Sequence, residues 1–237
     1  MTLNIATHKN ILIKVLKDMY TDSTLGPILG FKGGTAAYLF HGLTRFSVDL
    51  DFDLLDSEKK VYVLERVGKI LSSYGTVKEA APKRFNLFYM LSYDDKVEGA
   101  QNVKIEINCR DFGSKYEVKS YLGISMKVMV REDMAAHKLV AMFERLGKTN
   151  RDIFDIWFFL QNEWPINREI IERRTKMAFM DFLQKCIDAL EKMTDRGILA
   201  GMGELLDEKL KTWARTKLRM ETIFLLKLKL ENERGVT

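Results

Sequence analysis

Three aspartates alternate with apolar residues over residues 48–54, in the order Val-Asp-Leu-Asp-Phe-Asp-Leu. Side chains of a strand point alternately to its two faces, so Asp49, Asp51 and Asp53 would share one face and the apolar residues the other. Alternate Cα atoms of a strand lie about 7 Å apart, and carboxylates at that spacing can converge on one divalent cation. Oxygen ligands suit Mg²⁺ or Mn²⁺ rather than zinc. The alternative interpretation is the solvated polar face of an edge strand.

A second alternating segment, residues 103–108, supplies another carboxylate. Lys104, Glu106 and Asn108 share its polar face, and valine and isoleucine occupy the other. If this strand neighbours the aspartate strand, Glu106 would complete a metal site with the first two aspartates. A solvated glutamate is the alternative.

A glycine pair precedes the aspartates. Gly33, Gly34 and Thr35 follow a short apolar run and open a predicted helix, and backbone N–H groups at a helix start can hold phosphate oxygens. The spacing of glycine and lysine excludes a P-loop and a dinucleotide-binding fingerprint. A phosphate cradle, a short helix and then an Asp-x-Asp strand form a specific order along the chain.

This order resembles the DNA-polymerase-beta-like nucleotidyltransferase superfamily. Residues 32–40, KGGTAAYLF, and residues 45–51, RFSVDLD, are similar to the first motif of the AbiEii/AbiGii-type nucleotidyltransferase toxins. These are the toxin halves of bacterial abortive-infection toxin–antitoxin pairs, and the MenT toxins are relatives. The family pattern is G-G-[ST]-A-L followed by R-x-S-x-D-x-D, and this chain has Ala37 where leucine is usual.

The second half of the resemblance lies on two predicted helices. Residues 136–145 match the family pattern K-x-x-A-x-x-x-R, and residues 151–155 match R-D-x-x-D. Lys138 and Arg145 are seven residues apart and therefore share a helix face. The resemblance implies that this basic face meets a triphosphate or the acidic strand. A solvated lysine and a structural arginine are the alternative.

Two aspartates of the R-D-x-x-D segment are candidates, because a carboxylate in such apolar surroundings needs a partner. Thr149 and Asp152 have the spacing of a helix-capping pair, which is a structural explanation for Asp152. Asp155 has no such explanation, although Arg145 or Arg151 is a candidate partner for it. The resemblance implies one functional carboxylate here, so Asp152 is favoured and Asp155 is kept.

The resemblance implies a metal-dependent transfer of a nucleoside monophosphate from an NTP to an acceptor. Mg²⁺ or Mn²⁺ would bridge the triphosphate, and two ions can stabilise the attacking and leaving oxygens. The implied roles are metal binding for Asp49, Asp51 and Glu106, phosphate binding for Gly33, Gly34 and Thr35, loop orientation or phosphate contact for Arg45 and Ser47, and charge neutralisation for Lys138.

The resemblance also implies the acceptor and a partner. The expected acceptor is RNA, the 3′ end of tRNA in particular, whose modification would block translation; a protein hydroxyl is the alternative. A cognate antitoxin encoded nearby is the implied partner. Two basic groups would suit RNA phosphates, although solvated helix faces are the alternative. They are Lys211, Arg215 and Arg219 at i, i+4 and i+8, and the cluster Arg168, Arg173, Arg174 and Lys176.

Two other functions stay open. An antibiotic- or protein-modifying nucleotidyltransferase would share the acidic strand, but the lysine helix and the R-D-x-x-D helix favour the toxin group over antibiotic modification. A catalytically inactive binding module of the same fold is the other alternative. The expected acidic and basic positions are all filled in this chain, which argues against it.

The elements that position these residues follow from the apolar periodicity. Strands concentrate before residue 130 and helices after it, which predicts an α+β fold. The predicted strands are 28–31, 48–54, 85–93, 103–108 and 116–130, the last broken at Gly123. The predicted helices are 3–19, 35–41, 57–73 with Ser57 as N-cap, 132–146, 151–162, 167–176, 178–193 and 203–232.

We therefore expect two domains. Residues 1–130 would form a polymerase-beta-like nucleotidyltransferase core, in which helices flank a mixed sheet. Residues 131–237 would form a helical bundle that contributes to the active site.

The composition fits a folded protein of the cytoplasm. Hydrophobic residues make up 46% of the 237, and Cys109 and Cys186 are too few for a disulfide framework. The sequence contains neither the apolar core of a signal peptide nor the roughly 18 apolar residues of a membrane span. A formal net charge of +5 favours anionic partners. The oligomeric state stays open, with a monomer as the simplest expectation.

Overall fold

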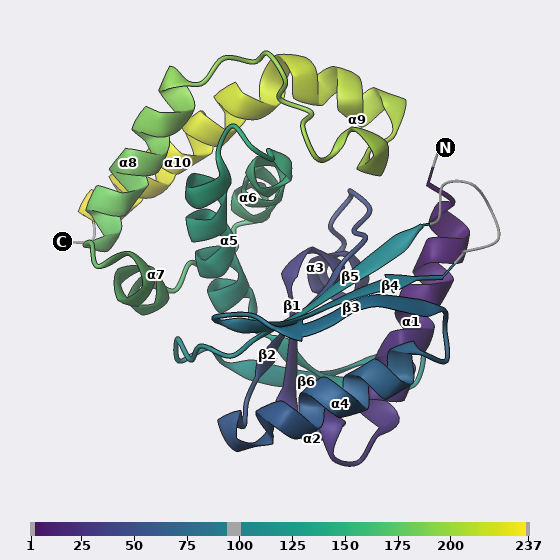
Figure 1. Cartoon of the computed structure of the whole chain (residues 1–237). Helices are drawn as coiled ribbons and strands as arrows, with labels where there is room; N and C mark the ends of the chain where they lie inside the picture. Colours follow the sequence, from purple (N-terminus) through teal and green to yellow (C-terminus); the bar gives the residue numbers. More distant parts are fainter. Residues whose placement is uncertain (1–2, 94–100, 236–237) are drawn as a thin grey trace. The chain divides into compact units, whose positions relative to one another are not determined.

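The computed structural model describes residues 3–93 and 101–235, which divide into two compact units (Figure 1). The first, the sheet unit, comprises residues up to 111 together with 115–129. The second, the helical unit, comprises residues 112–114 and those from 130 onward. The short segment 112–114 thus groups with the helices, although the strands on either side of it belong to the sheet.

The sheet unit is built on a seven-stranded mixed sheet in the order β3-β4-β5-β2-β1-β7-β6. The strands are β1 (Leu29–Lys32), β2 (Leu50–Leu54), β3 (Thr76–Pro82), β4 (Asn86–Ser92), β5 (Asn102–Asn108), β6 (Tyr116–Tyr121) and β7 (Ile124–Met129). β2 pairs parallel with β5 and β1 pairs parallel with β7, whereas the other pairs are antiparallel. The α+β class predicted from the sequence is confirmed, and the predicted break at Gly123 separates β6 from β7. β3 lies in a region where we delimited no strand.

Apolar and polar residues alternate along β2 and β5, which are neighbouring strands near the centre of the sheet. Leu50, Phe52, Ile105 and Ile107 are fully buried, so both strands are held by the core on one face. Their parallel register places Leu50 beside Ile105 and Phe52 beside Ile107, and it places the polar residues between them in register as well. β2 begins two residues later than predicted, so Asp49 lies just before the strand.

Helices flank this sheet. They are α1 (Ile5–Thr21), α2 (Leu25–Ile28), α3 (Gly33–His41), the 3₁₀ turn η1 (Ser57–Lys59) and α4 (Lys60–Leu71). α4 contacts α1 and the strands β3 and β4, along which it runs in Figure 1. The prediction of Ser57 as N-cap is wrong: the Asp56 side chain accepts a hydrogen bond from the Glu58 amide, because a carboxylate one residue earlier reaches that donor.

The helical unit is a bundle whose elements are α5 (Arg131–Arg145), α6 (Arg151–Gln161), α7 (Arg168–Thr175), α8 (Phe179–Lys192), η2 (Gly203–Leu205), α9 (Glu208–Trp213), the π-helical turn η3 (Ala214–Leu218) and α10 (Arg219–Gly235). Trp157 and Trp213 pack with ring centroids 4.2 Å apart, and each indole N–H donates to the Glu221 carboxylate. This cluster ties α6, α9 and α10 together.

The prediction of one helix over 203–232 is wrong. The Asp207 side chain accepts a hydrogen bond from the Leu210 amide, so a new helix starts at Glu208. The π-helical turn at 214–218 then widens the backbone before α10 begins. Within residues 3–93 and 101–235, no helix has the length and apolar character that crossing a membrane requires.

Candidate active site

The predicted carboxylates lie on one polar face at the centre of the sheet. Asp51 of β2 is the direct register partner of Glu106 of β5. The Lys104 ammonium lies 3.7 Å from a carboxylate oxygen of Asp49 and 3.7 Å from one of Glu106. The sequence placed Lys104 on this face but assigned it no role. In the structure it bridges two of the three predicted metal ligands and partly neutralises their charge.

The glycine turn lies directly against Asp51. Gly33 has φ +80, a conformation that favours glycine, and a Cβ atom there would lie 2.5 Å from an Asp51 carboxylate oxygen. α3 therefore starts beside this carboxylate. In the described part of the chain the first turn of α3 receives no side-chain cap, so its N–H groups are suited to phosphate oxygens.

Three other predicted phosphate-site residues are buried beneath this turn. A Cβ at Gly34 would lie 2.8 Å from both the Arg45 guanidinium and the Ser47 hydroxyl. The Thr35 hydroxyl donates to the Asp49 carbonyl and lies 3.0 Å from the Ser47 hydroxyl. Burial of these three side chains favours orientation of the loop over direct contact with phosphates.

His8 also braces the segment before Asp49, and sequence reasoning gave it no role. Its Nε2 donates to the Val48 carbonyl at 2.9 Å, and its Nδ1 lies 2.7 Å from the Tyr93 hydroxyl. Burial lowers the pKa of His8, while the Val48 carbonyl and the charge of Asp49 oppose that shift. A signal existed in the sequence, because His8 shares the apolar stripe of α1 with Leu12.

Asp53 is separated from the other aspartates by its environment. It is buried and receives hydrogen bonds from Lys32, Asn108 and Tyr116 at 2.5, 2.6 and 2.5 Å. Burial by itself raises the pKa of the Asp53 carboxyl, but the charge of Lys32 and these hydrogen bonds lower it below its ordinary value. Asp53 therefore has a structural role, because its hydrogen bonds link β2 to β1, β5 and β6.

Asp53→Asn is expected to destabilise the sheet unit by about 3 kcal/mol at pH 7, because Lys32 loses its buried counter-charge. The lowered pKa means that this stabilisation is full above the ordinary pKa of about 3.9 and is lost as the pH falls below it. Urea unfolding at pH 7 and at about pH 3 measures both effects. The exposed Glu65→Gln is the control, and an equal difference between Asp53→Asn and wild type at both pH values would contradict the assignment.

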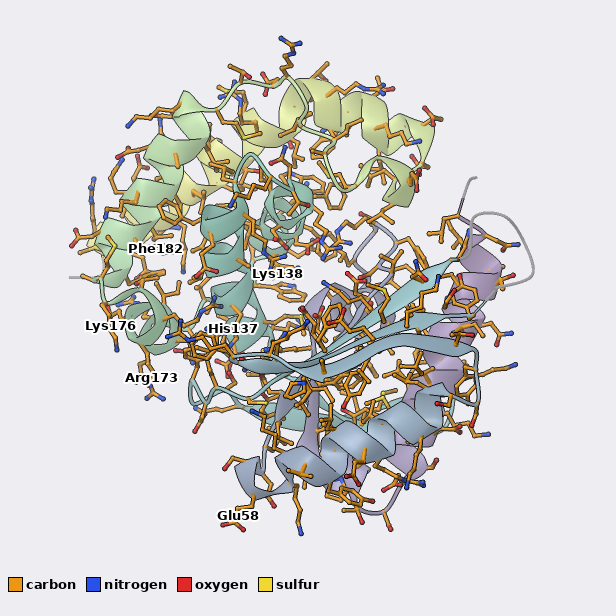
Figure 2. The ribbon with its side chains drawn as sticks, in the orientation of Figure 1. Glu58, His137, Lys138, Arg173, Lys176 and Phe182 are labelled. Atoms are coloured by element: carbon orange, nitrogen blue, oxygen red, sulfur yellow. The ribbon has the colours of Figure 1, made fainter. Side chains whose placement is uncertain are left out.

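The helical unit brings its three predicted residues together. Lys138 of α5 lies 2.7 Å from Asp152 and 2.8 Å from Asp155 of α6, whose side chains are fully buried. Arg145 lies 3.3 Å from the second oxygen of Asp152. Figure 2 labels Lys138 on α5. The basic face predicted for α5 is thus paired with the aspartates of α6.

Two expectations about these aspartates change. The helix-capping pair of Thr149 and Asp152 is wrong, because Asn150 occupies the N-cap position and Asp152 points to Lys138. Lys138 also binds Asp155, a pairing that we did not predict. Burial raises the pKa of Asp152, but the charges of Lys138 and Arg145 outweigh burial and the repulsion from Asp155, so the net pKa is lowered.

The two basic groups are largely engaged within the helical unit. Lys211 pairs with Glu208 at 2.6 Å, and Arg219 pairs with Asp195 at 2.7 Å and donates to the Leu190 carbonyl. Lys211 lies on α9 and Arg219 on α10, and the π-helical turn that contains Arg215 separates these two helices. In the second cluster Arg168 pairs with Glu233, and Arg174 with Glu144 and His137. Arg173 and Lys176 of this cluster are labelled in Figure 2.

The carboxylates on the polar face of the sheet are the candidate ligands for a metal ion. Over the described ranges, no group of three histidine, cysteine, aspartate or glutamate side chains is arranged to hold one. The oxygen-only chemistry of Asp49, Asp51 and Glu106 nevertheless fits Mg²⁺ or Mn²⁺.

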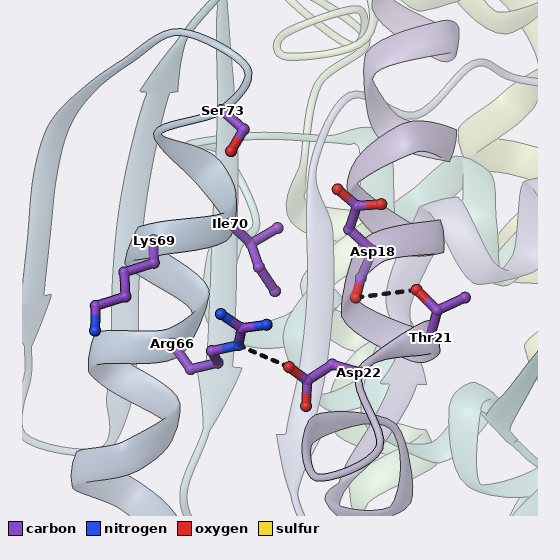
Figure 3. Close-up of a pocket in the computed structure, with 7 residues that line it drawn as sticks. All are labelled: Asp18, Thr21, Asp22, Arg66, Lys69, Ile70 and Ser73. Carbon is purple, nitrogen blue, oxygen red and sulfur yellow. Dashed lines mark hydrogen bonds and ion pairs between the residues drawn. The ribbon is translucent and has the colours of Figure 1, made fainter.

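A separate cavity of about 330 Å³ lies between α1 and α4 (Figure 3). Its Asp22 is already paired with Arg66, and none of its lining residues is a predicted site residue.

The sheet, the glycine turn and the acidic face define a nucleotidyltransferase-like protein. The sequence matches the family described as nucleotidyl transferase AbiEii toxin, type IV toxin–antitoxin system, over residues 14–223. The chain therefore belongs to this family, and the resemblance seen in its motifs is confirmed. Membership implies an antitoxin partner. No curated protein matches the chain.

Solved structures share this fold. A candidate nucleotidyltransferase from Helicobacter pylori is 21% identical, with a TM-score of 0.65 over 100% of this chain and 99% of that one. JHP933 from Helicobacter pylori is 22% identical, with a TM-score of 0.63 over 100% and 97%. MenT4, a nucleotidyltransferase toxin from Mycobacterium tuberculosis, is 16% identical, with a TM-score of 0.62 over 97% and 86%.

Proposed function

We propose that this toxin transfers a nucleoside monophosphate from an NTP to RNA, with the 3′ end of tRNA as the acceptor. The observation that carries the proposal is the contact between the start of α3 and Asp51, with Glu106 in register beside it. N–H groups suited to phosphate oxygens thus adjoin carboxylates suited to a divalent cation. Phosphoryl-type transfer requires mainly positioning and charge neutralisation, which such a surface provides.

The sheet residues have distinct proposed roles. Asp49, Asp51 and Glu106 would hold Mg²⁺ or Mn²⁺, which supplies charge neutralisation for the triphosphate when it is bound. Gly33 and Gly34 leave the backbone open to phosphate oxygens, since a side chain at either position would collide with neighbours. Thr35, Arg45 and Ser47 hold the turn in place.

Lys138 would supply positive charge for the triphosphate during the reaction, as the family motif implies. Asp152 and Asp155 hold the Lys138 ammonium in position. Of the two, Asp152 is the favoured functional carboxylate of the family motif, and it also pairs with Arg145. Lys211 and Arg215 are the proposed contacts with acceptor phosphates. Arg219 of the same predicted stripe is assigned instead to a structural role, because it pairs with Asp195 and also donates to the Leu190 carbonyl, whereas among the described residues Lys211 pairs only with the exposed Glu208 of its own helix.

Labelling of RNA tests this proposal. Purified protein, total cell RNA, Mg²⁺ and each α-labelled NTP in turn are expected to give labelled RNA of tRNA size. Chelation of Mg²⁺ should abolish the label, and binding of RNA should weaken steeply with salt because phosphate contacts release counterions. Lys211→Ala/Arg215→Ala should lower RNA labelling several-fold while NTP binding is unchanged.

The controls separate the alternatives. Lys209→Ala, an exposed lysine on the same short helix, should label RNA as the wild type does. Label on protein with none on RNA would contradict the RNA acceptor and favour a protein hydroxyl. Label on an added aminoglycoside alone would favour antibiotic modification, and absence of NTP binding would favour an inactive module.

A further inference from the structure

An apolar stripe is exposed along α10. Met220, Phe224 and Leu228 are 56%, 64% and 44% exposed, although each is a large apolar residue. They are spaced four residues apart and therefore lie on one helix face. The opposite face carries Ile223, Leu226 and other residues buried against α6 and α8. The exposed stripe is thus separate from the core contacts of this helix.

The charges at the two ends of the stripe are opposite. Lys217 lies seven residues before Phe224 and Glu231 lies seven residues after it, and both are exposed. With Met220 and Leu228 the spacing along the chain is 3, 4, 4 and 3 residues; Lys217 belongs to the π-helical turn that leads into α10, and the other four residues belong to α10 itself. This pattern is symmetric in spacing about Phe224 and reversed in charge.

We propose that this face, formed by Lys217, Met220, Phe224, Leu228 and Glu231, pairs with the same face of a second copy of the chain in an antiparallel dimer. In a two-fold symmetric dimer, the patch of one chain packs on the same patch of the other chain. Phe224 then packs on the partner's Phe224, and Met220 on the partner's Leu228. Lys217 meets the partner's Glu231 at both ends. A parallel pairing would place lysine on lysine and glutamate on glutamate, so charge selects the antiparallel orientation.

The expected dimer is weak and reversible. One pair of helices buries less than the roughly 1,200–2,000 Å² of a stable interface. A dissociation constant in the micromolar range or weaker is therefore expected, and dimer formation depends on protein concentration. The inference rests on α10 and its preceding turn alone, so it is independent of the proposed reaction.

Sedimentation equilibrium of the full-length protein with charge-swap variants tests the dimer. Lys217→Glu and Glu231→Lys should each raise the dissociation constant at least tenfold, because each creates two like-charged contacts. The double swap restores opposite charges at both ends and should return the constant to within about threefold of wild type. Phe224→Glu should abolish association without lowering the melting temperature, since the side chain is exposed.

Val61→Glu is the matched control, because Val61 is an exposed apolar residue on a helix of the sheet unit. It should associate as the wild type does. A wild type that stays monomeric up to about 1 mM, or a double swap no better than either single swap, would overturn the proposal. Wild-type binding to phosphatidylserine vesicles that Phe224→Glu abolishes, with no dimer detected, would show instead that the stripe binds membranes.

Discussion

Asp51→Ala is expected to abolish growth inhibition and to lower NTP consumption by about 100-fold or more. Loss of a residue that only hydrogen-bonds to a metal ligand already lowers metal affinity or activity roughly 10–100-fold. Asp51 is proposed as a ligand itself, so its loss should cost at least as much. Its side chain is partly exposed on the polar face and faces Gly33, so truncation removes no core packing. Growth on induction and NTP turnover of the purified protein are the measurements.

Two controls make this result specific. Glu58→Ala removes an exposed acid of the same unit, labelled in Figure 2, and should leave toxicity unchanged. The melting temperature of Asp51→Ala should stay within a few degrees of wild type. Full toxicity of Asp51→Ala at equal expression would remove the metal role of this strand.

Lys138→Met is expected to destabilise the helical unit by about 3–5 kcal/mol and to abolish activity. The substitution leaves Asp152 and Asp155 buried without their shared cation. Because the pKa of Asp152 is lowered, the stability that ionised Asp152 contributes is full above about pH 4 and is lost as the pH falls below that value. Urea unfolding at pH 7 and at about pH 3 measures the effect. The exposed Lys148→Met is the control.

A triple variant distinguishes folding from catalysis. Lys138→Met/Asp152→Asn/Asp155→Asn removes the cation and both buried charges together, and it should recover most of the lost stability. It should stay inactive if Lys138 supplies charge to the triphosphate. Wild-type NTP turnover by this folded variant would return the three residues to a purely structural role.

Local periodicity of the sequence was sufficient to predict most of the strands and helices and the faces that their side chains share. Alternation in 48–54 and 103–108 identified which side chains share a face, because the direction of a side chain in a strand depends only on its neighbours. The glycine pair and the two helical motifs were enough to identify the family. Helix ends were less accurate, since Asp56 and Asp207 cap through hydrogen bonds that spacing alone did not distinguish.

Partners distant in the sequence were decided by tertiary structure. Asp49, Asp51 and Asp53 look equivalent in the sequence, yet Asp53 is buried among Lys32, Asn108 and Tyr116. Only strand order determines this, because β1 and β5 flank β2 and β6 contributes the tyrosine. Packing of α5 on α6 likewise gave Lys138 two aspartates. Such pairings depend on which elements become neighbours, and that choice is set by the packing of the whole core rather than by local sequence.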